Sequence, residues 1–137
     1  MTLGREAEAG APQFAGLWWA LGWAMVLFIL YSTLAPSRDV PDLHIWDKLE
    51  HATAFFGMTF WFGGLLPRRR FWVLGVVMAA FGAAIEVGQG TMGLGRDMDI
   101  HDWIADACGI VVALALLTCV PRSQGSWLRW VERLIRR

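Results

Sequence analysis

The chain has 137 residues, of which 56% are hydrophobic and only 18% are charged, and its mean hydropathy is +0.45. Twelve Lys and Arg balance twelve Asp and Glu, so the formal net charge is zero and the chain has no basic domain suited to nucleic acid. This composition excludes an ordinary soluble domain and indicates an integral membrane protein.

Four apolar stretches predict membrane-crossing helices. They cover residues 14–35, 49–66, 71–85 and about 102–120. They predict an all-α fold, an integral membrane four-helix bundle within residues 14–121, preceded by a disordered polar tail at residues 1–13. Residues 122–137 place apolar side chains on one side of a helix and mostly charged ones, including Glu132, on the other, which predicts a basic amphipathic helix at the membrane interface.

Small residues in the second, third and fourth stretches predict close helix packing. They are Gly57, Gly63 and Gly64 in the second stretch, Gly75, Ala79, Gly82 and Ala83 in the third, and Gly109 in the fourth. Residues 90–98 contain three glycines and are predicted to form a loop between the third and fourth stretches.

Basic residues gather on one side of this topology. With four crossings, both ends of the chain share a side with the loop between the second and third stretches. That side holds nine of the twelve basic residues: Arg5, Arg68, Arg69, Arg70, Arg122, Arg129, Arg133, Arg136 and Arg137. The positive-inside rule therefore predicts a multi-pass protein of the bacterial cytoplasmic membrane with both termini in the cytoplasm.

Two polar clusters fall on the opposite, extracytoplasmic side. The first contains Asp47, Lys48 and His51, and the second contains Glu86, Gln89, Arg96, Asp99, Asp102 and Asp106. His51, Glu86 and Asp106 lie at nearly the same depth, about 21 to 23 Å from the inner ends of their helices at 1.5 Å per residue. Because charges inside a bilayer are costly, these three side chains are predicted to face one another rather than lipid.

Three functions fit these polar residues. For an enzyme, the candidates for acid–base catalysis are Asp47, His51, Glu86 and Asp102, and the candidates for substrate binding are Lys48, Gln89, Arg96, Asp99 and Asp106. Asp47 would orient His51, and Lys48 and Arg96 would bind phosphate or carboxylate. The same residues could instead form a packing network that locks the helices together, or line an ion or proton pathway.

No metal ion and no cofactor is predicted from these patterns. The run Asp97-x-Asp99-x-His101-Asp102 resembles the start of a calcium loop, but it lacks that loop's glycine and its distal glutamate.

Three segments in this order resemble the VanZ-like family of small bacterial membrane proteins. They are DKLEH at residues 47–51, EVGQ at residues 86–89 and RDMDIHDWIADACG at residues 96–109, and the similarity covers roughly residues 43–116. The family takes its name from a determinant of low-level resistance to the glycopeptide teicoplanin, and most members have no assigned biochemical activity. Many members carry Asn at the position of Asp106, where this chain has an additional acid.

The resemblance and the polar site together favour a protein that acts on, or binds, an envelope lipid or a cell-wall component, with a link to glycopeptide resistance. A membrane lipid, anionic or polyprenyl, is the expected partner, and nucleic acid is not. The alternative is a non-enzymatic membrane module, such as a small permease, an ion or proton pathway or a structural partner, whose polar residues form a packing network.

Overall fold

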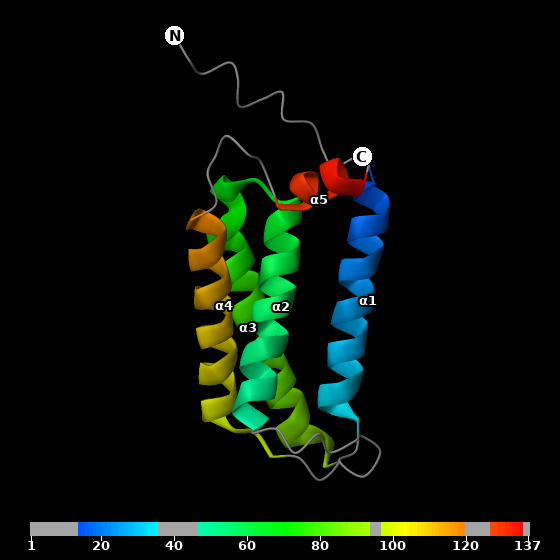
Figure 1. Ribbon diagram of the computed structural model, residues 1–137. Helices are drawn as coiled ribbons and strands as arrows, with labels where there is room; N and C mark the ends of the chain where they lie inside the picture. The colour runs from blue at the N-terminus through cyan, green and yellow to red at the C-terminus, as the bar shows by residue number, and fades with distance from the viewer. Residues whose placement is uncertain (1–13, 36–46, 94–96, 120–126, 136–137) are drawn as a thin grey trace.

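The computed structural model describes residues 14–35, 47–93, 97–119 and 127–135, and within these ranges it is helical without any strand (Figure 1). The helices are α1 (Ala15–Leu34), α2 (Asp47–Leu65), α3 (Phe71–Met92), α4 (Ile100–Cys119) and α5 (Trp127–Ile135), with a short 3₁₀ turn at Arg68–Arg70 before α3. The predicted all-α class is confirmed for this part of the chain.

Three of these helices are long and apolar enough to cross a membrane. They are α1, α3 together with its preceding turn, and α4. Helix α2 has 19 residues but begins with Asp47, Lys48 and Glu50, and these polar residues lower its mean hydropathy. Large apolar side chains such as Leu27 and Phe28 are mostly exposed on α1, which is the surface expected where a protein meets lipid. The helices thus indicate a multi-pass membrane protein.

Helices α1 to α4 lie side by side, and α5 lies across one end of them (Figure 1). Helix α2 contacts α1, α3 and α4, and its contact with α4 is the most extensive. The core consists of side chains from all four long helices: Ile29, Phe55, Met58, Phe62, Leu74, Met78, Ile85 and Ile110. Helices α2 and α3 contribute three of these eight residues each, and α2 has the more extensive contacts with the other long helices.

The contact between α2 and α4 depends on a glycine. A Cβ atom at Gly109 would collide with the carbonyl oxygen of Ala52 and would lie 2.9 Å from the backbone nitrogen of Phe56. The backbones of the two helices therefore touch at this point, as the small residues in the fourth stretch predict. Gly57 behaves differently, because a side chain there would meet nothing within 4 Å, and its predicted role in close packing is wrong.

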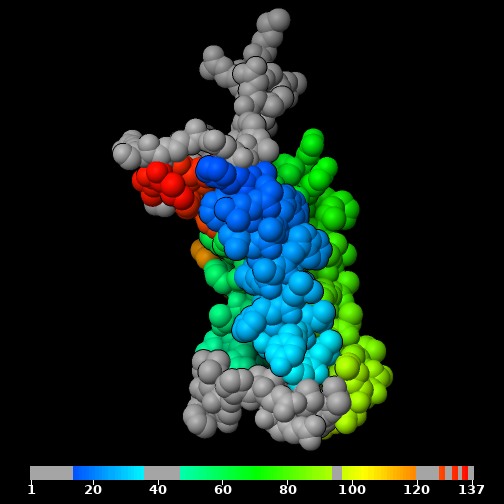
Figure 2. All heavy atoms as spheres, turned by 90° about the vertical axis from the view of Figure 1, so that its right-hand side faces the viewer, coloured from blue at the N-terminus to red at the C-terminus, as the bar shows by residue number. Residues whose placement is uncertain are grey.

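Helix α1 joins the other helices through aromatic side chains. The ring centroids of Trp18 and Trp61 are 5.6 Å apart, those of Trp23 and Phe62 are 5.9 Å apart, and Trp61 Nε1 donates to the carbonyl oxygen of Trp18. Figure 2 shows α1 covering one face of the molecule along its length. Because these wide rings separate the two backbones, α1 packs less closely on α2 than α4 does.

Helix α5 is attached to α1 by an acid that the sequence assigns to an exposed face. Glu132 is only 5% exposed, and its Oε1 accepts hydrogen bonds from the Phe14 backbone N–H at 3.0 Å and from Trp18 Nε1 at 2.9 Å. The expectation that Glu132 lies on the polar, outward side of this helix is wrong. The reason is the start of α1, whose unpaired N–H groups attract a carboxylate.

The loop after α3 begins later than predicted. Residues 90–92 continue the helix, which ends at Gly93 with a φ of 62°, in the left-handed region that glycine adopts without strain. The loop also ends earlier than predicted, because helix α4 begins at Ile100, two residues before the predicted start at Asp102. The predicted tail at residues 1–13 lies outside the described residues.

Replacement of Gly109 with Ala is expected to destabilise the protein, because the added methyl group would force the backbones of α2 and α4 apart. Overpacking of this kind costs about 1 to 3 kcal/mol in unfolding free energy. The melting temperature of the purified protein in detergent would measure it.

Gly57→Ala on α2 is the matched control. It adds the same methyl group in open space, where Ala is favoured over Gly in a helix by up to about 1 kcal/mol. The control should melt at the same temperature or higher, and equal losses in the two variants would contradict the assigned role of Gly109.

Candidate functional site

Three buried ionisable side chains from three helices meet at one point. His51 of α2 lies with its Nδ1 3.0 Å from Asp106 Oδ1 of α4 and 4.0 Å from Glu86 Oε1 of α3. None of the three residues is more than 5% exposed. The prediction that these residues share one level and face one another is confirmed. We refer to His51, Glu86 and Asp106 as the inner triad.

The space for the inner triad comes from a glycine on α3. Gly82 lies one turn before Glu86, and a Cβ atom at Gly82 would lie 2.6 Å from Asp106 Oδ2. Only the missing side chain lets the Asp106 carboxylate lie against the α3 backbone. On α4, Asp106 follows Asp102 by four residues, so the two carboxylates share a helix face and point to the same side of α2.

A second group of charges lies next to the inner triad, near the starts of α2 and α4. Lys48 Nζ is 2.8 Å from Asp102 Oδ1 and 3.0 Å from Asp99 Oδ2. The backbone N–H of Asp99 donates to Glu86 Oε2 at 2.9 Å, so Asp99 connects this outer group to the inner triad. We refer to Lys48, Asp99 and Asp102 as the outer group.

Asp99 also holds the start of α4. Its Oδ1 accepts from the backbone N–H of His101 and lies 2.8 Å from His101 Nδ1. The His101 N–H and, after it, the Lys48 ammonium hold the pKa of the Asp99 carboxyl well below its usual range. Asp99 is therefore a stable anion at the end of the molecule where α3 passes into α4.

The carboxylate that orients His51 is not the predicted one. Asp47 shares a helix with His51 and was expected to hold it, but the hydrogen-bonding distance is to Asp106 on α4. Asp47 is exposed, although its carboxylate lies within 4.8 Å of ligand atoms of His51 and Asp102. Asp106, which faces the His51 ring from the neighbouring helix, therefore takes the role predicted for Asp47.

Two of the predicted substrate-binding residues, Gln89 and Lys48, are already bonded to other groups of the protein. Gln89 is buried, but its Nε2 donates to the carbonyl oxygen of Thr33 at 3.0 Å and so joins α3 to α1. Arg96 lies outside the described residues. Lys48, predicted to bind an anionic group, is already paired with two carboxylates.

Negative charge exceeds positive charge among the described residues of the site. Five carboxylates, those of Asp47, Glu86, Asp99, Asp102 and Asp106, accompany only Lys48 and His51. In addition, Glu86 Oε1 and Asp106 Oδ2 are buried without a hydrogen-bond partner. Buried polar atoms are normally paired, so these two oxygens mark a place where the site is incomplete.

An apolar groove lies beside the site on the same two helices. It measures about 220 Å³ and is lined by Ala52, Thr53, Phe56, Cys108, Gly109 and Val112. The lining begins one residue after His51 on α2 and two residues after Asp106 on α4. A polar site and an apolar groove are therefore adjacent along the long axis of the molecule.

Sequence reasoning missed the two glycines that shape the site. Gly82 was noted only as part of a small-residue pattern, and Gly109 only as a packing residue, yet they set the positions of Asp106 and α2. A spacing signal was present, because Gly82 precedes Glu86 by four residues and Gly109 follows Asp106 by three. Each glycine thus lies about one turn from an acid of the inner triad.

Comparisons of the chain with protein families, with curated proteins and with solved structures gave no significant match. The VanZ-like resemblance therefore stays a prediction that rests on the three motifs.

Substitution of Asp99 by Asn is expected to lower the melting temperature at pH 7. A carboxyl with a depressed pKa in the folded state stabilises the fold above its unfolded value near 3.8 and loses that contribution as the pH falls further. The difference between the wild type and Asp99→Asn should therefore be constant from pH 7 to about pH 5 and shrink below about pH 4. The backbone bond to Glu86 is retained in the variant.

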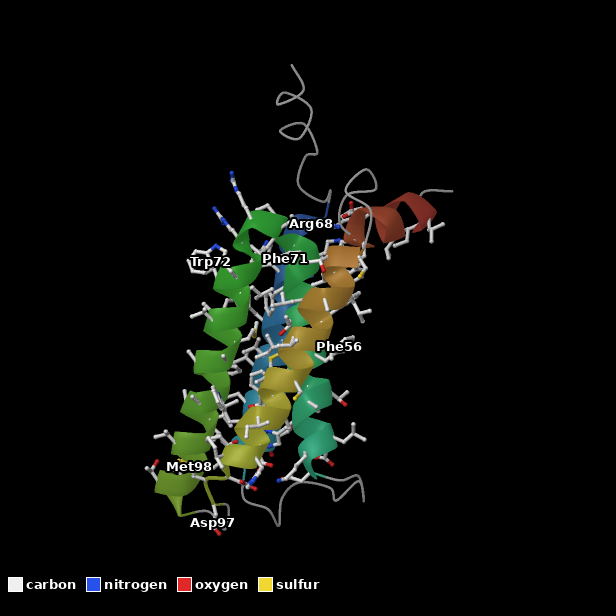
Figure 3. The ribbon with its side chains drawn as sticks, turned by 90° about the vertical axis from the view of Figure 1, so that its left-hand side faces the viewer. Phe56, Arg68, Phe71, Trp72, Asp97 and Met98 are labelled. Carbon is white, nitrogen blue, oxygen red and sulfur yellow. The ribbon has the colours of Figure 1, made fainter. Side chains whose placement is uncertain are left out.

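Asp97→Asn supplies the control for this experiment. Asp97 is exposed, and Figure 3 shows it at the tip of the same end of the molecule. This variant should melt like the wild type at pH 7. A difference for Asp99→Asn that persists unchanged at pH 3 would show that the charge of Asp99 is not what stabilises the fold.

Proposed function

We propose that the chain is a VanZ-like protein of the bacterial cytoplasmic membrane and that its polar site binds, or acts on, the headgroup of an envelope lipid. The ordered motifs support the family, and the link to glycopeptide resistance follows from that resemblance. The observation that carries the lipid proposal is the adjacency of the buried inner triad and an apolar groove on the same two helices.

The proposed arrangement has four membrane crossings, with α2 as the second, and α5 lying as an amphipathic helix at the cytoplasmic interface. The distribution of charge supports it. Figure 3 places Arg68 and Trp72 near one end of the molecule and Asp97 at the other. Basic residues favour the cytoplasmic side, and tryptophans favour the membrane interface. The polar site is then extracytoplasmic, a few Å below the outer membrane surface.

The groove suits the hydrocarbon part of a lipid. It is an open groove of about 220 Å³ with an apolar lining, so a hydrocarbon chain can lie along it. A lipid whose headgroup lies at the outer group would place the beginning of an acyl or polyprenyl chain at the level of Ala52 and Cys108. One molecule would then contact both the polar and the apolar part of the site.

The inner triad can supply acid–base chemistry to such a headgroup. Asp106 lies at hydrogen-bonding distance from His51 and would fix the orientation of its ring, which is the arrangement of a general acid or base held by a carboxylate. Glu86 provides a second carboxylate 4.0 Å from the same nitrogen. Proton transfer at a headgroup hydroxyl is the reaction that these groups support best.

A packing network remains the second candidate function, and the outer group favours it. Lys48 has two carboxylate partners, and Glu86 accepts a backbone hydrogen bond that fixes the start of α4. These bonds tie α2, α3 and α4 together at one end. In this alternative the site holds the helices in place and has no ligand of its own.

Native purification followed by lipid mass spectrometry tests the lipid proposal. The wild type should retain one lipid class at a level above its share of the membrane, and Cys108→Phe should lose it, because the larger ring fills the groove. Val111→Phe adds the same ring next to it on the exposed surface of α4 and should retain the lipid.

Two results would contradict the lipid proposal. One is a wild-type protein that carries lipids only in the proportions of the bulk membrane, which would favour the packing network. The other is equal retention by Cys108→Phe and the wild type, which would exclude the groove as the binding surface.

Cysteine labelling tests the proposed orientation. In a Cys108→Ala, Cys119→Ala background, a membrane-impermeant maleimide added to intact spheroplasts should label Thr91→Cys but not Arg69→Cys. Both positions are exposed, and they lie at opposite ends of the long helices. Permeabilised cells provide the control, in which both variants should react. Labelling of Arg69→Cys alone in intact spheroplasts would reverse the orientation and place the site in the cytoplasm.

A further inference from the structure

The inner triad has the composition and spacing of a metal site. His51, Glu86 and Asp106 come from three different helices and each offers one ligand atom, and these atoms all lie within 4.8 Å of one another. Imidazole nitrogens and carboxylate oxygens are both ligands of Zn²⁺, with bonds of about 2.0 to 2.2 Å. Three protein ligands leave the fourth position of a tetrahedral site for water or a substrate.

The measured distances are compatible with such a centre. With bonds of about 2.1 Å, the ligand atoms of a tetrahedral zinc site lie roughly 3.4 Å apart. His51 Nδ1 is 3.0 Å from Asp106 Oδ1 and 4.0 Å from Glu86 Oε1, so the two distances lie on either side of that value. The carboxylate oxygens of Glu86 and Asp106 lie within 4.8 Å of each other, so movements of the side chains alone would bring the three ligand atoms to these distances.

Two unpaired oxygens provide independent support. Glu86 Oε1 and Asp106 Oδ2 accept no hydrogen bond, and neither is open to water, because Glu86 is only 3% exposed and Asp106 is fully buried. Glu86 Oε1 is directed at the His51 ring, at the 4.0 Å distance given above. A carboxylate oxygen left without a donor in a membrane protein interior is costly, and a cation bound to Glu86 Oε1 would remove that cost.

Charge balance favours a cation over a buried water molecule as the occupant of the inner triad. Two carboxylates and one imidazole lie close together at a depth where the membrane opposes net charge. A water molecule could donate to the unpaired oxygens but would leave both charges in place. A divalent cation neutralises the two carboxylates while His51 stays neutral, as a metal ligand must.

We propose that His51, Glu86 and Asp106 bind a divalent transition-metal ion, with Zn²⁺ as the best-fitting species. The imidazole ligand disfavours Ca²⁺ and Mg²⁺, which take oxygen ligands. This inference stands on the inner triad alone and does not depend on the lipid proposal. If both hold, His51 is a metal ligand rather than the general acid or base, and the ion supplies the positive charge that a phosphate headgroup needs and that the doubly paired Lys48 lacks.

A second set of residues, Asp47, His51 and Asp102, has similar spacing but is the weaker candidate. Asp102 Oδ1 is already bonded to Lys48 at 2.8 Å, and Asp47 is exposed. Since both sets share His51, only their carboxylates distinguish them. The choice between them is therefore part of the test.

The experiment measures Zn²⁺ binding by the full chain, purified in detergent through a tag without histidine and stripped with a chelator. Isothermal titration with ZnCl₂ and elemental analysis should give one ion per chain, with weaker binding of Ca²⁺ and Mg²⁺. Glu86→Gln and Asp106→Asn should each weaken Zn²⁺ binding more than about tenfold, because even the loss of an outer-shell partner costs 10- to 100-fold in metal affinity. His101→Gln is the matched control, since His101 also lies against a carboxylate but at an exposed position.

A measurement on the wild type covers the possibility that the variants fail to fold. Co²⁺ added to the stripped protein should produce visible d–d absorption bands of a tetrahedral site, and Zn²⁺ should abolish them by displacement. The proposal is overturned by a wild type that binds no Zn²⁺ or gives no such bands. It is also overturned if Asp47→Asn weakens binding while Glu86→Gln does not, or if His101→Gln abolishes it.

Discussion

The site depends on the backbone contact between α2 and α4 at Gly109. Because position 109 has no side chain, the carbonyl oxygen of Ala52 can lie against α4. His51 precedes Ala52 by one residue and Asp106 precedes Gly109 by three, so this contact brings the imidazole and the carboxylate to 3.0 Å. Lys48, one turn earlier on α2, then reaches Asp102, one turn earlier on α4. The polar end of the molecule follows from the packing of its apolar part.

The same contact determines how charge is distributed through the site. In the outer group Lys48 compensates one of the two negative charges of Asp99 and Asp102, and Asp99 is exposed enough for water to screen the remaining one. The inner triad has no such access, and its two carboxylates have only His51 as a possible cationic partner among the described residues. An anionic ligand would therefore be repelled by the triad unless it arrived together with a cation.

Depth along a helix could be predicted from the sequence, whereas rotation about the helix axis could not. Each residue adds the same 1.5 Å rise, so counting from the helix ends correctly placed His51, Glu86 and Asp106 at one level. The pairing within that level depends on which face each helix turns toward its neighbours. For this reason Asp106 rather than Asp47 meets His51, and Gln89 contacts α1 instead of the other polar residues. Glu132 was misplaced because its partner, the start of α1, is distant in sequence.

The position of α2 among the other helices would allow it to make the proposed membrane crossing despite its polar beginning. A helix in contact with lipid all round must be apolar all round, and α1, α3 and α4 are on average apolar enough to cross a membrane. Helix α2 contacts all three of them, and its polar residues Lys48 and His51 meet the carboxylates of α4 instead of lipid. Its low hydropathy is thus compatible with the proposed crossing, because the cost of each polar group depends on what surrounds it rather than on the average along the helix.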